Sequence, residues 1–163
     1  MNAYRAKPLS FPWPPLVYGL AIVAALVVDS VGKLPLPRPE SSFFWFCGAG
    51  LTAAAVWLDI WAMKTLLEGR TPIISNAALV PSRTSPYLVT RGPFRFSRNP
   101  TYLGYTLITI GFALLTGNPW LLVAALSAAA ATDVIAIRHE ELCLLARYGC
   151  EFESYCRHTR RWL

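Results

Sequence analysis

The chain has 163 residues, of which 55% are hydrophobic and only 15% are charged, and its mean hydropathy is +0.41. This composition is unusual for a soluble protein and favours a single integral membrane domain, residues 1–163. The net charge of +6 is better explained by membrane topology and anionic lipid headgroups than by nucleic acid. Four cysteines without C-x-x-C spacing and only two histidines predict reduced packing cysteines and no metal site.

Four apolar blocks follow one another along the chain, and each approaches the roughly 20 residues that a transmembrane helix requires. The predicted spans are 16–31, 43–67, 102–116 and 120–137. The segment Gly117-Asn118-Pro119 is a turn signal, so the last two spans should form a tight helical hairpin. The first block is not followed by a signal-peptide cleavage site and is predicted to be a retained span.

The distribution of basic residues predicts the orientation of these spans. Of fifteen Lys and Arg, only Lys33 and Arg38 lie between the first two blocks. The positive-inside rule therefore places both termini and the 68–100 loop in the cytoplasm. The expected fold is all-α: a multi-pass transmembrane bundle of four spans, with a cytoplasmic cap formed by this loop and the C-terminal helices.

Two segments outside the spans carry most of the polar chemistry. The first, LVTRGPFRFSRNPTYLGY, ends the 68–100 loop and enters the third block. The second, RHEELCLLARYG, is predicted to be a helix on which Glu141, Leu142, Leu145 and Tyr148 share one face, with Gly149 as its C-terminal stop. A short second helix, EFESYCRH, should follow.

The order GPFRFSRNPTYLG, helical hairpin, EELCLLARYGCEFESYCRHTRRWL resembles the isoprenylcysteine carboxyl methyltransferase family and the related phospholipid N-methyltransferases. The resemblance covers residues 88–163 and implies a cofactor-binding core there. It implies methyl transfer from S-adenosylmethionine to a lipophilic acceptor that enters from the membrane. Asn99 stands where eukaryotic prenylcysteine enzymes usually carry His, which puts the substrate in doubt more than the fold. The chain has no glycine-rich dinucleotide fingerprint.

The resemblance also implies individual site residues. Glu141 and Arg98 are the catalytic candidates. The Glu140–Glu141 pair would hold the ammonium or other polar groups of the methionine moiety, whereas Arg98 would clamp a carboxylate or bind lipid phosphate. Without the resemblance, the glutamate pair reads as a charged helix end that pairs with Arg138 or His139. The cofactor-binding candidates are Val89, Thr90, Gly92, Phe94, Asn99, Tyr102, Gly104, Glu140 and Glu141.

Several of these residues also have a local structural reading. Asn99 and Pro100 are suited to cap and start the third span, and Gly92-Pro93 is suited to a turn. Gly104 admits close approach because it has no side chain. The run Ser127–Thr132 is predicted to be a close helix-packing surface.

Asp59, Asp133 and Arg161 are the substrate-site candidates. Asp59 belongs to the second block, which we expect to form the wall of a lateral opening for the acceptor, or it forms a structural pair with Lys64. Asp133 precedes Glu140 by seven residues, which predicts one shared helical face, and it either extends the polar pocket or pairs with an arginine of the 68–100 loop. The tail around Arg161 is the other possible route for the acceptor.

The sequence leaves the acceptor open. A carboxylate acceptor, as in the prenylcysteine branch, is already an anion at neutral pH, whereas an amine, as in the phospholipid branch, must first lose a proton. Motif similarity favours the carboxylate. The tail also resembles the ends of NADPH-dependent membrane sterol reductases, and a non-catalytic membrane scaffold is the alternative from another class of protein. The oligomeric state has no signal in the sequence.

Overall fold

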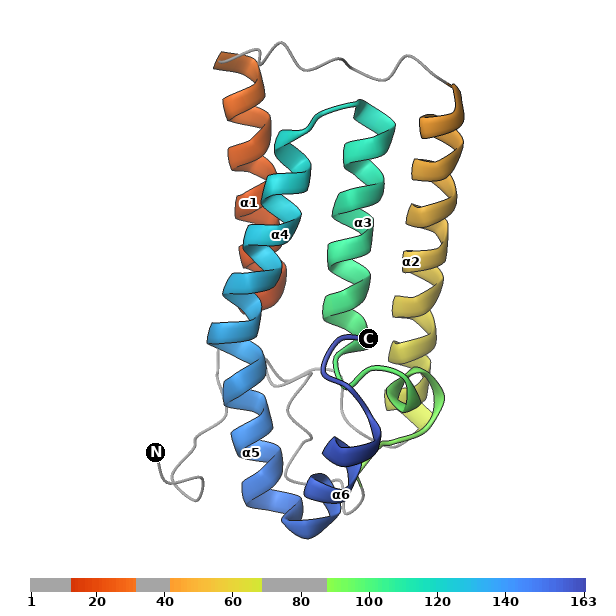
Figure 1. Ribbon diagram of the computed structural model, residues 1–163, viewed down its shortest axis with the longest axis vertical. Helices are drawn as coiled ribbons and strands as arrows, with labels where there is room; N and C mark the ends of the chain where they lie inside the picture. Colours follow the sequence, from red (N-terminus) through yellow and green to blue (C-terminus); the bar gives the residue numbers. More distant parts are fainter. Residues whose placement is uncertain (1–12, 32–41, 69–87) are drawn as a thin grey trace.

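The computed structural model describes residues 13–31, 42–68 and 88–163, and the predicted loops at 32–41 and 69–87 lie outside them. The described part of the chain is an all-helical bundle, as predicted (Figure 1). Its elements are α1 Trp13–Val31, α2 Ser42–Glu68, the 3-10 turn η2 Gly92–Arg95, α3 Pro100–Thr116, α4 Trp120–Thr132, the π turn η3 Asp133–Ile137, α5 Arg138–Tyr148 and α6 Cys150–His158.

The long helices have the length and the surface of membrane spans. Three helices, at 14–31, 42–68 and 120–148, are long and apolar enough to cross a bilayer. The fourth, α3, has 17 residues, the lower limit for a span. Large apolar side chains such as Leu20, Trp57 and Leu126 are more than half exposed, as expected for a surface that faces lipid. The chain is therefore a multi-pass membrane protein.

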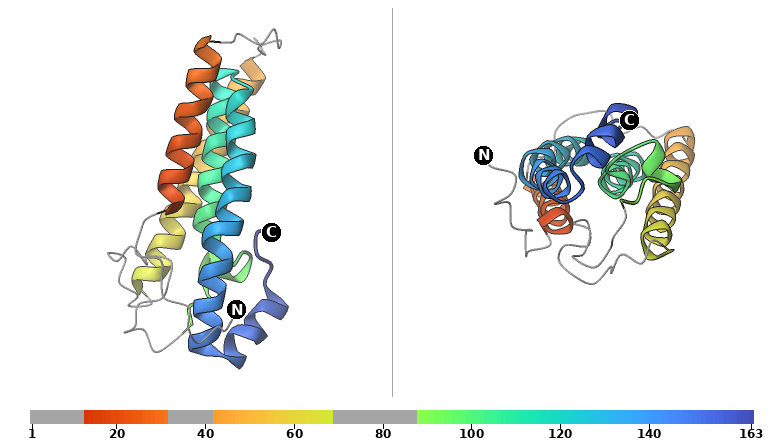
Figure 2. Two further views of the ribbon diagram at one scale, coloured as in Figure 1. Left: turned by 90° about the vertical axis from the view of Figure 1, so that its left-hand side faces the viewer. Right: turned by 90° about the horizontal axis from the view of Figure 1, so that it is seen from below.

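The helix α3 lies at the centre of the bundle. Seen from below, it lies between α2 and the continuous helix α4–α5 (Figure 2, right), and α1 packs against α4. The turn between α3 and α4 is formed by Gly117, with a φ of 64°, and by Asn118, whose Oδ1 accepts a hydrogen bond from the Trp120 amide at 2.9 Å. This confirms the predicted hairpin.

The contact between α2 and α3, here called the seam, uses a stripe of small residues on α2. The stripe recurs at alternating intervals of four and three residues, the spacing of two α-helices that wind around each other with a left-handed twist. It consists of Gly48, Thr52, Ala55, Asp59 and Ala62. Ala55 and Ala62 are fully buried. Helices in lipid associate through close packing because lipid is as apolar as their side chains, and small residues permit it.

The helix of the predicted fourth span does not end at residue 137. It continues through η3 into the predicted tail helix, α5, until Gly149, with a φ of 51°, ends it. The short helix α6 then turns back beside α5 (Figure 1). Within the run 127–132, Ala128 and Thr132 are buried, in agreement with the predicted packing surface.

Candidate functional site

The last five residues, 159–163, fold back onto residues 97–99 at the start of α3, and we call them the C-terminal segment. The Arg98 amide donates to the Arg160 carbonyl at 2.9 Å. The Ser97 hydroxyl and the side-chain amide of Asn99 both donate to the Arg161 carbonyl, at 3.3 and 3.1 Å. Asn99 occupies the N-cap position of α3 but makes no side-chain cap bond, so its predicted capping role is wrong. Its side chain instead fastens the C-terminal segment.

A cluster of four charged side chains, here called the Glu141 cluster, joins α5 to these two segments. Arg98 Nη2 lies 2.8 Å from Glu141 Oε1, and Arg161 Nη2 lies 2.6 Å from Glu141 Oε2. Arg161 Nη1 also contacts both oxygens of Asp133 at 3.4 Å. Arg98 further donates to the Thr159 carbonyl at 2.8 Å. The arginine and glutamate predicted to be catalytic therefore contact each other directly.

The π turn η3 determines which residues meet in this cluster. The hydrogen bonds of a π turn span five residues instead of four, so each helical face after the turn is taken by the residue about one position later in the sequence. Asp133 consequently shares its face with Glu141, eight residues on, and Arg161 binds both carboxylates. The predicted common face of Asp133 and Glu140 is wrong, because an uninterrupted α-helix was assumed. Asp133 does pair with arginines, but these are Arg161 and Arg138 and not an arginine of the described part of the 68–100 loop, as the other possibility required.

Glu140 has a different environment from its neighbour. It is 9% exposed, and its Oε1 accepts a hydrogen bond from the hydroxyl of Tyr102 at 2.6 Å. Tyr102 is fully buried between α3 and the helix that contains Ala136 and Ile137. The two glutamates thus point into different surroundings, and neither is a solvated helix end. Arg138, the suggested partner, instead lies 3.6 Å from Asp133.

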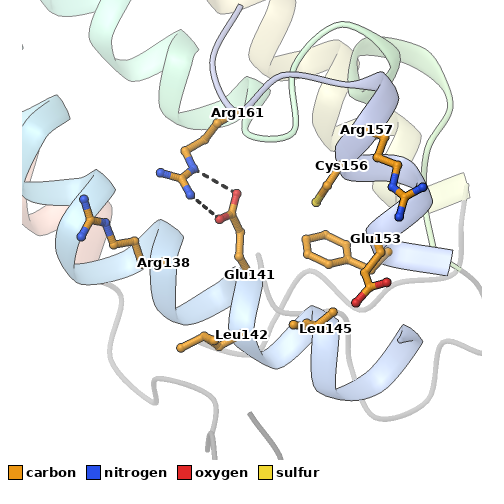
Figure 3. A pocket seen from close by; sticks show the side chains of 9 residues that line it. Arg138, Glu141, Leu142, Leu145, Glu153, Cys156, Arg157 and Arg161 are labelled. Carbon is orange, nitrogen blue, oxygen red and sulfur yellow. Dashed lines mark hydrogen bonds and ion pairs between the residues drawn. The ribbon is translucent and has the colours of Figure 1, made fainter. Parts of the chain in front are cut away.

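A cavity of about 640 Å³ opens between α5, α6 and the C-terminal segment (Figure 3). Glu141, Leu142 and Leu145 line it, which confirms most of the predicted face of α5, although Tyr148 is not among the lining residues. Sequence reasoning missed the α6 wall, yet its lining residues fall at i, i+1, i+4 and i+5, one helical face. The complete lining is Arg138, Glu141, Leu142, Leu145, Phe152, Glu153, Cys156, Arg157 and Arg161.

The protonation states beside the cavity follow from burial and charge. Burial raises the pKa of the Cys156 thiol, despite the opposing effect of Arg98, so this cysteine is a neutral thiol. Burial likewise raises the pKa of Tyr155, whose hydroxyl donates to the Phe94 carbonyl at 2.6 Å. The hydrogen bonds from Arg161 to Glu141 raise the pKa of the Arg161 guanidinium. Beside the cavity, Tyr155 is therefore a neutral phenol and Arg161 is permanently charged.

Other predicted site residues lie on the α2 side of α3. A Cβ on Gly104 would collide with the carboxylate of Asp59, so the space left by this glycine is taken by α2. Asp59 Oδ1 is buried and has no hydrogen-bond partner among the described residues, and no pair forms with Lys64. These contacts place Asp59 in the seam rather than at an open wall of α2.

The residues before α3 form the predicted turn. Gly92 has a φ of 62°, and a Cβ there would lie 2.6 Å from Thr65 Oγ1 on α2. Val89 is half-buried and Thr90 is exposed, whereas Phe94 is buried. The Phe94 carbonyl, through Tyr155, connects this turn to α6. Gly92 and Gly104 thus lie against α2, whereas Asn99 and Glu141 contact the C-terminal segment.

These features define a multi-pass membrane protein with a charged cavity at one end of a helical bundle. Residues 43–151 match the family model described as phospholipid methyltransferase. Because the match covers most of the chain, the protein belongs to the phospholipid methyltransferase family, a family of methyltransferases with lipid-type substrates. No curated protein and no solved structure matches the chain. The matched region includes α2 from residue 43 onward and the motifs up to residue 151, whereas most of α6 and the C-terminal segment lie beyond it.

Proposed function

We propose that this protein transfers a methyl group from S-adenosylmethionine to a lipid acceptor, and that the cofactor binds in the cavity between α5 and α6. The observation that carries the proposal is this cavity, with its mixed charges, in a member of a methyltransferase family. We place this end of the bundle in the cytoplasm. A reporter fused after Leu163 should then report the cytoplasmic side, and the opposite result would remove the cavity from the compartment of the cofactor.

The chemistry of the cavity fits the cofactor. Its volume of about 640 Å³ is within the usual range for small-molecule sites, about 300–1,000 Å³. The cofactor carries groups of both charge signs and an adenine, and the lining offers arginines, glutamates and the apolar side chains of Leu142, Leu145 and Phe152. When bound, S-adenosylmethionine supplies an electrophilic methyl group on a sulfonium.

The chain's own residues would position the reactants and exclude water. Arg98 fixes Glu141 against the C-terminal segment, and the carbonyls of Thr159 and Arg161 are themselves held by hydrogen bonds. This rigid wall limits the geometries available for an in-line transfer, which is the main requirement of a displacement reaction. The other cofactor candidates, Val89, Thr90, Gly92 and Gly104, would act through the shape of the bundle beside it.

We propose a phospholipid amine as the acceptor, on the strength of the family match. An amine must lose a proton before it attacks. Glu140 does not line the cavity, but it is the buried carboxylate next to Glu141, hydrogen-bonded at Oε1 to Tyr102, and we propose that it accepts this proton. The second candidate acceptor is an isoprenylcysteine carboxylate, which the motifs of residues 92–104 and 140–163 favour and which needs no such base.

The cavity assignment is tested by filling it. Leu145→Trp places an indole in the cavity and should abolish calorimetric binding of S-adenosylhomocysteine, whereas Leu144→Trp, on the same helix but outside the lining, should retain it. Transfer of labelled methyl is then compared between vesicles with phosphatidylethanolamine and a farnesylcysteine analogue. Absence of nucleoside binding and of transfer to either acceptor by the native protein would reject the function.

A further inference from the structure

The carboxylate of Glu141 is engaged by two guanidinium groups in the structure. Oε1 accepts from Arg98 Nε and Nη2 at 3.2 and 2.8 Å and from Arg161 Nε at 3.1 Å, and Oε2 accepts from Arg161 Nη2 at 2.6 Å. A carboxylate offers about four lone-pair sites, two on each oxygen, so Oε1 is fully used whereas Oε2 accepts one N–H group. A ligand ammonium could bind at Oε1 only by displacing a guanidinium.

Apart from the Glu141–Arg161 ion pair, the side chains that line the cavity carry a net positive charge. The lining has three arginines and two glutamates, and one of these glutamates is Glu141. Figure 3 shows Arg138 and Arg157 on either side of the Glu141–Arg161 pair. Arg138 has a weak contact with Asp133 at 3.6 Å, whereas Arg157 makes no ion pair within the described ranges. Arg157 is therefore the guanidinium most available to a ligand.

We infer that the cavity binds an oxyanion through Arg157, with Arg138 as a second cation, and that Glu141 is occupied in holding Arg98 and Arg161. This rests on the proposed function and names the group of the cofactor that docks there, the carboxylate of its methionine end. A guanidinium suits such a group because its N–H donors match two oxygens at once. The same chemistry is offered by the phosphodiester of a lipid acceptor, and the experiment separates the two sources.

The test compares two nucleosides that differ only at the amino-acid end. S-Adenosylhomocysteine carries the carboxylate and ammonium, whereas 5′-methylthioadenosine carries neither. Arg157→Gln should weaken binding of S-adenosylhomocysteine about tenfold or more in a calorimetric titration, the usual effect of losing a charged hydrogen bond. Binding of 5′-methylthioadenosine should stay unchanged. Arg147→Gln, on α5 but outside the lining, is the matched control and should change neither affinity.

Each other outcome has a defined meaning. If Arg157→Gln leaves both nucleosides unaffected but raises the KM for phosphatidylethanolamine vesicles, the oxyanion is the lipid phosphodiester and the inference of an oxyanion site stands. Equal weakening of both nucleosides would show a deformed cavity and overturn it, as would no change in any of the three measurements. If the native protein binds neither nucleoside, the proposed function fails first.

Discussion

The seam between α2 and α3 and the Glu141 cluster are held together by different physics. In the seam, small side chains let two helix backbones approach, and a hydroxyl such as that of Thr52 bonds only within its own helix, to the Gly48 carbonyl. In the cluster, long charged side chains bring together segments more than forty residues apart in sequence. Within lipid, shape determines the packing, whereas at the polar end of the bundle charge and hydrogen bonds determine the cavity.

The largest effect should come from removing the shared carboxylate of the cluster. Glu141→Gln gives Arg98 and Arg161 a neutral amide in place of their common carboxylate, and both arginines are partly buried. We expect the free energy of unfolding, measured by titration with a denaturing detergent, to fall by about 2–3 kcal/mol, as for loss of charged hydrogen bonds. Glu151→Gln, at an exposed position on α6, is the control. Equal stability of the two variants would mean that charge does not hold this end together.

A smaller loss is expected from adding one methyl group to the seam. A Cβ on Gly48 would lie 2.9 Å from both the Gly111 oxygen and the Leu115 nitrogen, which are backbone atoms that cannot rotate away. Gly48→Ala should therefore destabilise the protein by about 1–2 kcal/mol in the same titration. Gly50→Ala, two residues further on, meets nothing within 4 Å and should be neutral or stabilising. If both variants behave alike, close backbone approach does not hold α2 to α3.

The sequence predicted the parts of the fold that local patterns determine. Apolar blocks gave the four long helices, Gly117 marked the hairpin and Gly149 marked the end of the helix after Glu141, because each signal lies within a few residues of its consequence. The motifs predicted that both Arg98 and Glu141 belong to the site, and the two side chains are in contact.

Other features had no local signal. The return of the C-terminal segment onto Ser97 and Asn99 joins residues more than sixty positions apart, and no periodicity records it. The π turn at residues 133–137 adds one residue to the helical register, so a calculation with 3.6 residues per turn assigned Glu140 to the face of Asp133. The sequence also did not indicate what fills the space beside Gly104, because its neighbour Asp59 lies on another helix.

The reactivity of Cys156 tests whether water is excluded from the cavity wall. Burial raises the pKa of its thiol, and only a thiolate is alkylated readily. In a variant that retains Cys156 alone, the alkylation rate should therefore continue to rise with pH beyond the ordinary thiol pKa of about 8.5 before it levels off. S-Adenosylhomocysteine should slow the reaction, because Cys156 lines the cavity. A rate that levels off at the ordinary thiol pKa, without protection, would contradict a desolvated wall.

The smallest effect should come from a hydrogen bond inside the spans, and it sharpens the contrast between the two regions most directly. The hydroxyls of Tyr18 and Thr106 lie 2.6 Å apart and are buried between α1 and α3. Thr106→Val preserves the shape and removes the bond, and such bonds between transmembrane helices average about 0.6 kcal/mol. Thr116→Val, at an exposed site on the same helix, removes only a bond to the Phe112 carbonyl and serves as control. A loss that matched the effect of Glu141→Gln would show that hydrogen bonds, and not shape, hold the spans together.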